Sequence, residues 1–330
     1  MQLQQRRIGH SGLTSSALGL GCMGMSEFYG ATDEAQSLAT LEAALAAGVT
    51  LFDTADAYGF GHNEQLLGRF LARHRGQALV ATKCGLAREA GSYARRVDNS
   101  PAYIRQACEA SLARLGVEAI DLFYLHRLNL DTPLAESMGA LAQLMQEGKI
   151  HAVGLCEVSA ATLRRAAALC PVAAVQSEYS LWTREPEQGV LAACRDVGAS
   201  FFAYSPLGRG FLTGTIAGAA SLDAGDFRHF NPRFAGDNLA RNQAIAGLVK
   251  RMAHDKGCTP AQLALAWLLA QGDDIIPIPG TKRIAYLHDN LGALDVRLDA
   301  AELAAISAAF PLGMAAGARY TDEGMKGVDA

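Results

Sequence analysis

The amino-acid sequence predicts an α/β protein built as a (β/α)8 TIM barrel, with an N-terminal β-hairpin and a long loop after strand 7. Eight short apolar runs alternate with longer segments of helical periodicity. The runs are almost continuously apolar, which is typical of a parallel sheet covered by helices. The candidate strands are Ala17–Leu20, Val49–Asp53, Ala78–Thr82, Ile120–Leu125, His151–Leu155, Ala173–Glu178, Ser200–Tyr204 and Asp274–Ile278.

Three of the intervening segments carry a helix start signal. Ser100, Thr132 and Thr259 each precede a proline, so that a capping hydroxyl stands before a proline at the first helical position. Gly116 and Gly148 follow the first two segments and predict their ends. Strand and helix therefore alternate along the chain, and a doubly wound open sheet is the alternative to a closed barrel.

The segments outside the repeats have distinct characters. Leu3–Ile8 and Leu13–Ser16 flank the turn GHSG and predict a hairpin that covers the bottom of the barrel. Residues 207–240 are too rich in Gly, Asp and Asn for an ordinary barrel loop, and loops of this length are usually functional or disordered. No linker, repeat or low-complexity tract divides residues 1–330, so a single domain is expected.

The composition argues against several classes of partner. A net charge of −4 gives no overall attraction to the phosphates of nucleic acids or membranes. No segment has the roughly 18 uninterrupted apolar residues of a membrane span, and the N-terminus does not resemble a secretory signal. The seven cysteines form no CxxC pair, as expected in a reducing compartment. A cytoplasmic protein without nucleic-acid or membrane partners is expected.

Residues 19–24, GLGCMG, match the glycine fingerprint of dinucleotide-binding folds. That fingerprint requires a helix that opens directly at the glycines, because the pyrophosphate lies at the helix N-terminus. Here MSEFYGAT intervenes, and AALAAG stands about 20 residues on, where an acidic residue holds the ribose. We therefore reject a Rossmann site, although these glycines could still let the backbone approach a ligand.

Polar residues recur at the carboxyl ends of the predicted strands. In a barrel these ends lie on one face, where the chemistry of such enzymes takes place. Taken singly, each residue has an ordinary explanation, such as a turn or a solvated side chain. Taken together they favour a site at this rim, with contributions from Asp53, Tyr58, Lys83, His126, Cys156, Glu157, Gln176, Tyr204 and Ser205.

The first four of these residues make a chemically consistent set. A buried Lys83 would lose its charge unless a carboxylate paired with it, and Asp53 can be that partner. Lys83 can in turn favour the phenolate of Tyr58, whose ordinary pKa is about 10. His126 could bond the same substrate oxygen, so the set predicts a proton donor to a carbonyl. No activated nucleophile or metal-ligand cluster is evident in the sequence, and hydride from a reduced nicotinamide would supply the other reactant.

The chain resembles the aldo-keto reductase superfamily, especially its bacterial and plant branch of general aldehyde reductases. The resemblance rests on LGLGCMGMS, LFDTADAYG, ATKCG, DLFYLHR, HAVGLCEVS, AAVQSEYSLWTRE, FAYSPLGRGFLTG, NPRF and IPIPGTKRIAYLHDNLGAL. It implies a barrel that binds NADPH in extended form at the C-terminal rim. It also implies a catalytic tetrad of Asp53, Tyr58, Lys83 and His126, with Tyr58 as general acid.

The resemblance also implies the contacts of the cofactor. Cys156, Glu157 and Gln176 are expected at the nicotinamide carboxamide, and Tyr204 is expected to stack on the ring. The remaining candidates are Gly21, Cys22 and Met23 after the first strand, Ser205, Pro206, Leu207 and Gly208 along the pyrophosphate, Gly210 and Arg233 in the long loop, and Gly280, Lys282, Arg283, Asp289 and Asn290 around the adenosine. Lys282 and Arg283 beside a helix N-terminus suit a 2′-phosphate.

Three positions depart from the pattern of the superfamily. Cys156 stands where a serine usually bonds the carboxamide, and a thiol is a weaker donor. Thr215 stands where members of the superfamily often have a lysine that reaches the cofactor phosphates. Tyr286 stands where they often have a glutamine near the adenine. Modestly weaker cofactor binding is expected from these differences.

The leading hypothesis is NADPH-dependent reduction of an aldehyde or ketone, with a small-molecule carbonyl compound as substrate. One alternative is an NADPH-binding regulatory or redox-sensing subunit with little turnover. Another is a phosphate-substrate isomerase, which is less consistent with the cofactor-type residues on strands five to eight. The substrate and any homo-oligomer are left open. Specificity is expected in Met25–Ala31, Leu86–Asn99, Gly208–Phe230 and the C-terminal tail, and Phe28, Tyr29, Tyr93 and Trp182 are candidates for an apolar pocket.

Overall fold

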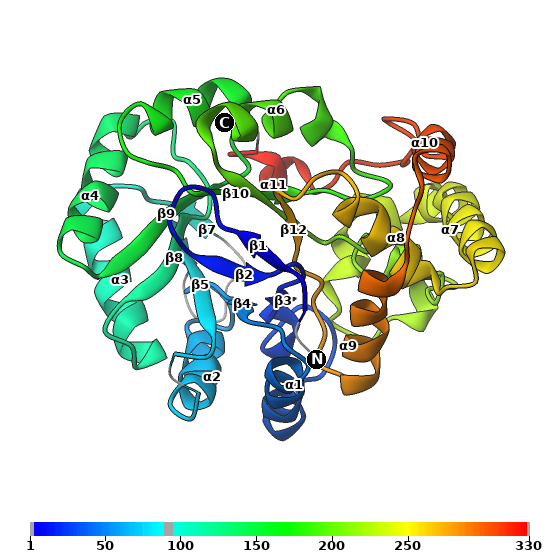
Figure 1. Ribbon diagram of the computed structural model, residues 1–330, viewed down its shortest axis with the longest axis horizontal. Coiled ribbons are helices and arrows are strands. Elements are labelled where there is room, and N and C mark those ends of the chain that lie inside the picture. Colours follow the sequence, from blue (N-terminus) through cyan, green and yellow to red (C-terminus); the bar gives the residue numbers. More distant parts are fainter. Residues whose placement is uncertain (1–2, 75, 89–94, 329–330) are drawn as a thin grey trace.

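A sheet of parallel strands organises the computed structural model, which describes residues 3–74, 76–88 and 95–328 (Figure 1). Within these residues the sheet has eight strands in the order β12-β11-β10-β9-β8-β5-β4-β3. Their bounds are β3 Leu20–Gly21, β4 Leu51–Asp53, β5 Leu79–Cys84, β8 Ile120–Leu125, β9 Ile150–Cys156, β10 Ala174–Glu178, β11 Ser200–Tyr204 and β12 Ile275–Pro277. The eight predicted strands are therefore present, and the first is displaced toward Gly21.

The sheet closes into a barrel between its first and last strands. Gly21 forms a parallel bridge with Gly280, just beyond β12. The amide of Gly19 donates to the carbonyl oxygen of Pro277 at 3.0 Å, and that of Gly21 donates to Pro279 at 3.1 Å. The (β/α)8 prediction is thus confirmed, and the open doubly wound sheet is excluded.

Helices surround the barrel (Figure 1), and two of the three predicted helix start signals are confirmed. Ser100 accepts a hydrogen bond from the amide of Tyr103, and Thr259 forms a capping box with Gln262. The expected cap at Thr132 is wrong, because Pro133 takes the cap position without a side-chain bond. The helices are α1 Glu34–Ala46, α2 His62–Leu71, α3 Pro101–Leu115, α4 Leu134–Gln146, α5 Ala160–Ala167, α6 Val190–Val197, α7 Gly236–Lys256, α8 Pro260–Leu269, α9 Ile284–Leu291, α10 Ala300–Ala309 and α11 Asp322–Met325.

The predicted hairpin covers the amino-terminal end of the barrel. Strands β1 Gln5–Arg7 and β2 Thr14–Ser16 pair antiparallel and lie in front of the barrel in Figure 1. The hydroxyl of Ser200, at the start of β11, donates to the carbonyl oxygen of Arg7 and accepts from the amide of Gly9. The hairpin is therefore fixed to the bottom of the barrel, as expected.

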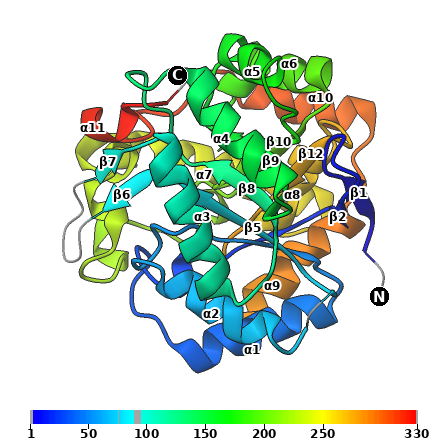
Figure 2. The same ribbon diagram turned by 90° about the vertical axis from the view of Figure 1, so that its left-hand side faces the viewer.

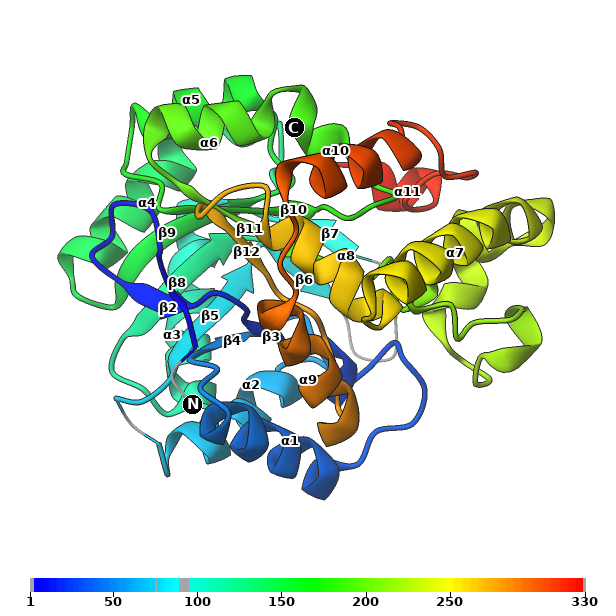
Figure 3. The same ribbon diagram turned by 45° about the vertical axis from the view of Figure 1, so that its right-hand side comes forward.

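Further segments surround the opposite rim. Strands β6 Leu86–Arg88 and β7 Arg95–Val97 form a separate antiparallel pair after β5, with α11 near them in Figure 2. Residues 89–94, including Tyr93, lie outside the described part of the chain. The long segment after β11 contains four 3₁₀ turns, Phe211–Thr213, Ala219–Ser221, Phe227–Phe230 and Pro232–Phe234, and leads into α7, which packs against α8 (Figure 3).

The barrel interior and the helix–sheet interface form separate apolar cores. The interior cluster contains Leu51, Ala81, Tyr124, Ala174 and Phe202. The larger cluster fills the space between the sheet and the surrounding helices. No helix among the described residues has both the length and the apolar character needed to cross a membrane.

Two helical glycines provide a matched test of this packing. A Cβ at Gly68 in α2 would lie 2.5 Å from the carbonyl oxygen of Arg114, whereas a Cβ at Gly139 in α4 would meet nothing within 4 Å. We expect Gly68→Ala to lower the free energy of unfolding by roughly 1–3 kcal/mol through overpacking. Gly139→Ala is expected to raise it by about 0.5–1 kcal/mol, because alanine favours the helix. Urea titration measures both changes, and equal effects of the two substitutions would contradict the described approach of α2 to α3.

Candidate active site

The top layer of the barrel interior holds the polar residues that the sequence singled out. Side chains alternate along a strand, so residues two apart point to the same side of the sheet. Two residues beyond the interior core positions 51, 81, 124, 174 and 202 stand Asp53, Lys83, His126, Gln176 and Tyr204. The alternation that buries the core therefore delivers these five side chains to one layer at the rim.

A buried ion pair lies at the centre of this layer. The ammonium of Lys83 donates to Asp53 Oδ1 at 2.5 Å and to the carbonyl oxygen of Thr54 at 2.7 Å. Gln176 Nε2 donates to Asp53 Oδ2 at 2.8 Å, so both carboxylate oxygens are bonded. Lys83 is fully buried, and Asp53 is 4% exposed. Burial lowers the pKa of Lys83, but the charge of Asp53 and the smaller contributions of Tyr58, Cys156 and the hydrogen bond to Asp53 together raise it by more, so this pKa is raised.

Tyr58 lies over this pair on the loop that follows β4. Its hydroxyl is 3.5 Å from Lys83 Nζ, and its ring meets that of His126 edge to face at a centroid distance of 5.8 Å. Burial raises the pKa of Tyr58, and the opposing influence of Lys83 is smaller. The net shift is opposite to the one expected from Lys83 alone. Tyr58 is therefore a phenol rather than a phenolate at neutral pH in this structure.

Hydrogen bonds from several elements fix the loop that carries Tyr58. Thr54 Oγ1 donates to Asn63 Oδ1 at 2.6 Å, and Asn63 Nδ2 donates to the carbonyl oxygen of Cys22 at 2.9 Å. Arg88 Nη1 donates to the carbonyl oxygen of Ala57 at 2.8 Å. The loop is thus tied to α2, to the end of β3 and to β6, which holds Tyr58 above Lys83.

A cavity of about 1120 Å³ opens above the layer. Most of the residues expected at the site line it: Gly21, Met23, Asp53, Tyr58, His126, Cys156, Gln176, Tyr204, Ser205, Pro206, Leu207, Gly210, Gly280, Lys282, Arg283, Asp289 and Asn290. Five do not lie in its wall: Cys22, Lys83, Glu157, Gly208 and Arg233. Cys22 packs in the helix–sheet core, Lys83 lies beneath Tyr58, and Gly208 packs against the ring of Trp182.

Glu157 is bonded to neighbouring side chains and does not line the cavity. Its Oε1 accepts from the hydroxyl of Tyr204 at 2.7 Å and from the amide of Glu178 at 2.9 Å. Arg319 of the C-terminal tail donates to both of its carboxylate oxygens. The hydroxyl of Tyr204 also lies 2.7 Å from that of Tyr320. Glu157 thus positions Tyr204 and the tail in this structure.

Glu178, at the end of β10, anchors the long loop. Arg209 Nη2 donates to one of its oxygens at 2.9 Å, and Arg233 Nη1 donates to the other at 3.2 Å. Arg233 also donates to Thr183 Oγ1 at 2.6 Å, so it is buried behind the cavity wall. Glu178, Arg209 and Arg319 are not among the predicted site residues, although a glutamate two residues after Gln176, at the end of the same strand, is a visible signal.

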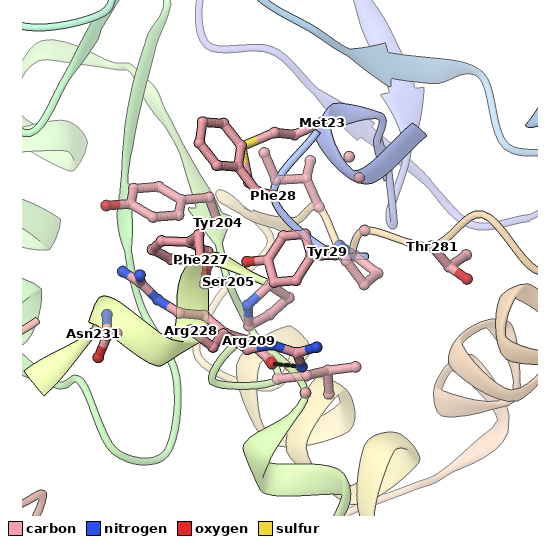
Figure 4. Close-up of a pocket in the computed structure, with 18 of the residues that line it drawn as sticks. Met23, Phe28, Tyr29, Tyr204, Ser205, Arg209, Phe227, Arg228, Asn231 and Thr281 are labelled. Atoms are coloured by element: carbon pink, nitrogen blue, oxygen red, sulfur yellow. Dashed lines mark hydrogen bonds between the residues drawn. The ribbon is translucent and has the colours of Figure 1, made fainter. Parts of the chain in front are cut away.

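Three segments meet above the cavity, where Figure 4 shows the rings of Phe28, Tyr29, Tyr204 and Phe227 gathered together. The amide of Phe227 donates to the carbonyl oxygen of Phe28 at 3.0 Å, and the Arg228 guanidinium lies 5.1 Å from the ring centroid of Tyr29. These contacts join the long loop to the segment between β3 and α1.

The cations beyond β12 lie at the other end of the cavity wall. Lys282 Nζ donates to the carbonyl oxygens of Tyr29 and Ala31 at 2.7 and 2.5 Å. Arg283 is the residue before α9, and its guanidinium lies 5.5 Å from the ring centroid of Tyr286. Asp289 accepts from the side chains of Thr259 and Gln262. This end therefore carries positive charge beside a helix N-terminus.

Two of the predicted aromatic residues line the cavity, and one does not. Phe28 and Tyr29 form part of its wall. Trp182 instead stacks on Phe211 at a centroid distance of 4.8 Å and meets Phe234 edge to face. It packs beneath the long loop, and its predicted place in the pocket is wrong.

Known proteins resemble this chain over almost its whole length. The aldo-keto reductase yakc (NADP(+)) of Schizosaccharomyces pombe is 44% identical over 325 residues, which cover 97% of this chain and 95% of that protein. The structure of a glycerol dehydrogenase from Gluconobacter oxydans matches with a TM-score of 0.84 and 30% identity, over 99% of this chain and 96% of the other. An aldo-keto reductase from Klebsiella pneumoniae in complex with NADPH has a TM-score of 0.72 and 26% identity, over 94% and 96%.

The profile of the Aldo/keto reductase family matches residues 17–310, which extend from the residues just before β3 to the end of α10. This match and the 44% identical relative show that the chain belongs to the aldo/keto reductase family.

Proposed function

We propose that this oxidoreductase uses NADPH to reduce an aldehyde or ketone to an alcohol, with Tyr58 as the proton donor. The observation that carries the proposal is the buried Lys83–Asp53 pair directly beneath the Tyr58 hydroxyl, at the floor of a large cavity. The relative from S. pombe bears NADP(+) in its name, and the structure from K. pneumoniae holds NADPH, which supports the same cofactor here.

The cavity suits an extended dinucleotide together with a small substrate. Its volume of about 1120 Å³ exceeds the roughly 300–1,000 Å³ of ordinary small-molecule sites. Tyr204 offers a ring surface near the polar layer, and Lys282 and Arg283 offer positive charge near the far end. Residues 205–207 and Gly210 would follow the pyrophosphate between these two ends. Bound NADPH would supply the hydride that reaches the carbonyl carbon.

The four tetrad residues take complementary roles in this proposal. The phenol of Tyr58 gives its proton to the carbonyl oxygen, and the Lys83 ammonium stabilises the phenolate that remains. Asp53, fixed by Gln176, holds Lys83 in place and in its charged form. The ring of His126 contacts that of Tyr58, which supports a role for His126 in orienting the same oxygen.

We further propose that residues 1–330 act as a single domain in the cytoplasm. One barrel with continuous apolar cores spans the described chain, which supports the first point. All seven cysteines are free thiols, which supports a reducing compartment.

Removing the Tyr58 hydroxyl tests the assigned proton donor. We expect Tyr58→Phe to lower kcat by roughly 10²–10⁴-fold, the usual contribution of general acid catalysis. NADPH binding, followed by protein fluorescence quenching, should stay close to that of the wild type. Near-normal turnover would contradict the role of Tyr58, whereas tight NADPH binding without turnover in the wild type would favour the regulatory alternative.

The raised pKa of Tyr58 predicts the pH dependence of reduction. A donor whose pKa is raised keeps its proton at neutral pH and loses activity only as the pH rises through that pKa. We therefore expect kcat/KM for reduction to be constant between about pH 6 and 9 and to fall only above roughly pH 10. A decline with a midpoint near pH 6.5, the ordinary pKa of histidine, would instead identify His126 as the donor.

Charge removal at Arg283 tests the adenosine end. We expect Arg283→Gln to weaken NADPH binding about tenfold, because a charge-assisted hydrogen bond is lost, and to leave NADH binding unchanged. Arg297→Gln is the control, since Arg297 is exposed and lies outside the cavity wall. Equal losses for both nucleotides would show that Arg283 does not contact the 2′-phosphate.

A further inference from the structure

Arg127 is a buried cation in the cavity wall with few hydrogen-bond partners. It follows His126 in the chain, is 4% exposed and lines the cavity. Its Nη1 donates to the carbonyl oxygen of His126 at 2.7 Å, while its Nε is buried without a partner. Among the described residues no carboxylate lies within 4.0 Å of its guanidinium, and the ring of Tyr320 is 6.0 Å away.

The neighbouring buried arginines differ from Arg127 in this respect. Arg209 and Arg233 both pair with Glu178, and Arg319 pairs with Glu157. Both oxygens of Glu157 are already bonded to Arg319. This carboxylate therefore cannot serve Arg127 without giving up an existing ion pair.

Arg127 keeps its charge in this position. Burial lowers its pKa, but the oxygens of Tyr204, Tyr320 and Glu157 raise it by more, so the net shift is upward. A buried charge that forms no ion pair is costly, and an anion bound in contact with it would offset that cost. A planar guanidinium with several N–H donors matches a carboxylate particularly well.

We propose that Arg127 binds a carboxylate of the substrate, so that the preferred substrates are short aldehyde acids or keto acids. The inference rests on the proposed carbonyl reduction at Tyr58. Arg127 adjoins His126 at the reaction end of the cavity, whereas Lys282 and Arg283, the cations suited to the cofactor phosphate, lie beyond β12. An anion at Arg127 is therefore expected to belong to the carbonyl compound.

The experiment compares 2-, 3- and 4-carboxybenzaldehyde with their methyl esters, measured as NADPH consumption. The ring suits the apolar wall formed by Phe28, Leu86 and Tyr320. We expect at least one acid to have a kcat/KM ten-fold or more above that of its ester, mainly through a lower KM. Arg127→Gln should lower kcat/KM for the acid, so that the acid and its ester differ by less than three-fold. Arg127→Lys should restore part of the preference for the acid.

Matched controls separate this role from a general loss of charge or of folding. Arg195→Gln removes a positive charge at an exposed position paired with Asp274, and should leave the preference unchanged. Thermal unfolding and NADPH affinity confirm that each variant is intact, and selectivity of the wild type tests the proposal even if Arg127→Gln does not fold.

Three outcomes would overturn the inference. The wild type could reduce every acid and its ester equally well, the Arg127→Gln variant could lose both activities in the same proportion, or its main defect could be weaker NADPH binding. If neither acids nor esters are reduced, the proposed carbonyl reduction itself fails, which is a distinguishable result.

Discussion

The ion pair between Lys83 and Asp53 is the interaction on which the site depends. Two charges are removed from water at the top of the barrel interior, which is favourable only with excellent geometry and further hydrogen bonds. The carbonyl of Thr54 and the amide of Gln176 supply those bonds. Asp53 and Lys83 come from the paired strands β4 and β5, whereas Gln176 comes from β10, so the full set of bonds beneath Tyr58 requires all three strands to face one barrel interior. The fold thus supplies the complete set of partners that the buried charges require.

The rim of the barrel contains further buried carboxylates that pair with cationic side chains. Glu157 and Glu178 end neighbouring strands, and each is bonded to arginines from segments distant in sequence. Arg209 and Arg233 belong to the long loop, and Arg319 belongs to the tail. Two strand ends therefore position two irregular segments, and these bonds to the sheet add to the contacts that the loops make with one another. Tyr204 is held by the same carboxylate that holds the tail.

The strands, the hairpin and the layer of polar strand ends could be predicted because they follow from periodicity, which is local. Asp53, Lys83, His126, Gln176 and Tyr204 share one face because strands alternate with period two. The partners of Glu157 and Arg233 could not be predicted, because they depend on where a long loop and the tail return. The sequence predicts the charge of Lys83 near Tyr58, which favours a lowered pKa. Burial, which a sequence does not display, is the larger influence and raises the pKa of Tyr58. Trp182 resembled a pocket residue for the same reason: exposure follows from tertiary packing.

The seam of the barrel explains two of the three glycines of the nucleotide fingerprint in this chain, Gly19 and Gly21. A Cβ at Gly21 would lie 3.0 Å from the carbonyl oxygen of Ile278 and 3.4 Å from the Cα of Gly280, and one at Gly19 would lie 2.9 Å from the side chain of Ile278. Glycine is needed here because another strand, not a pyrophosphate, comes close to the backbone. The same steric requirement thus places glycines in a dinucleotide-binding turn and at the seam of this barrel, which are unrelated structures. A glycine pattern therefore indicates that another group comes close to the backbone, but it does not identify whether that group is a ligand or a strand.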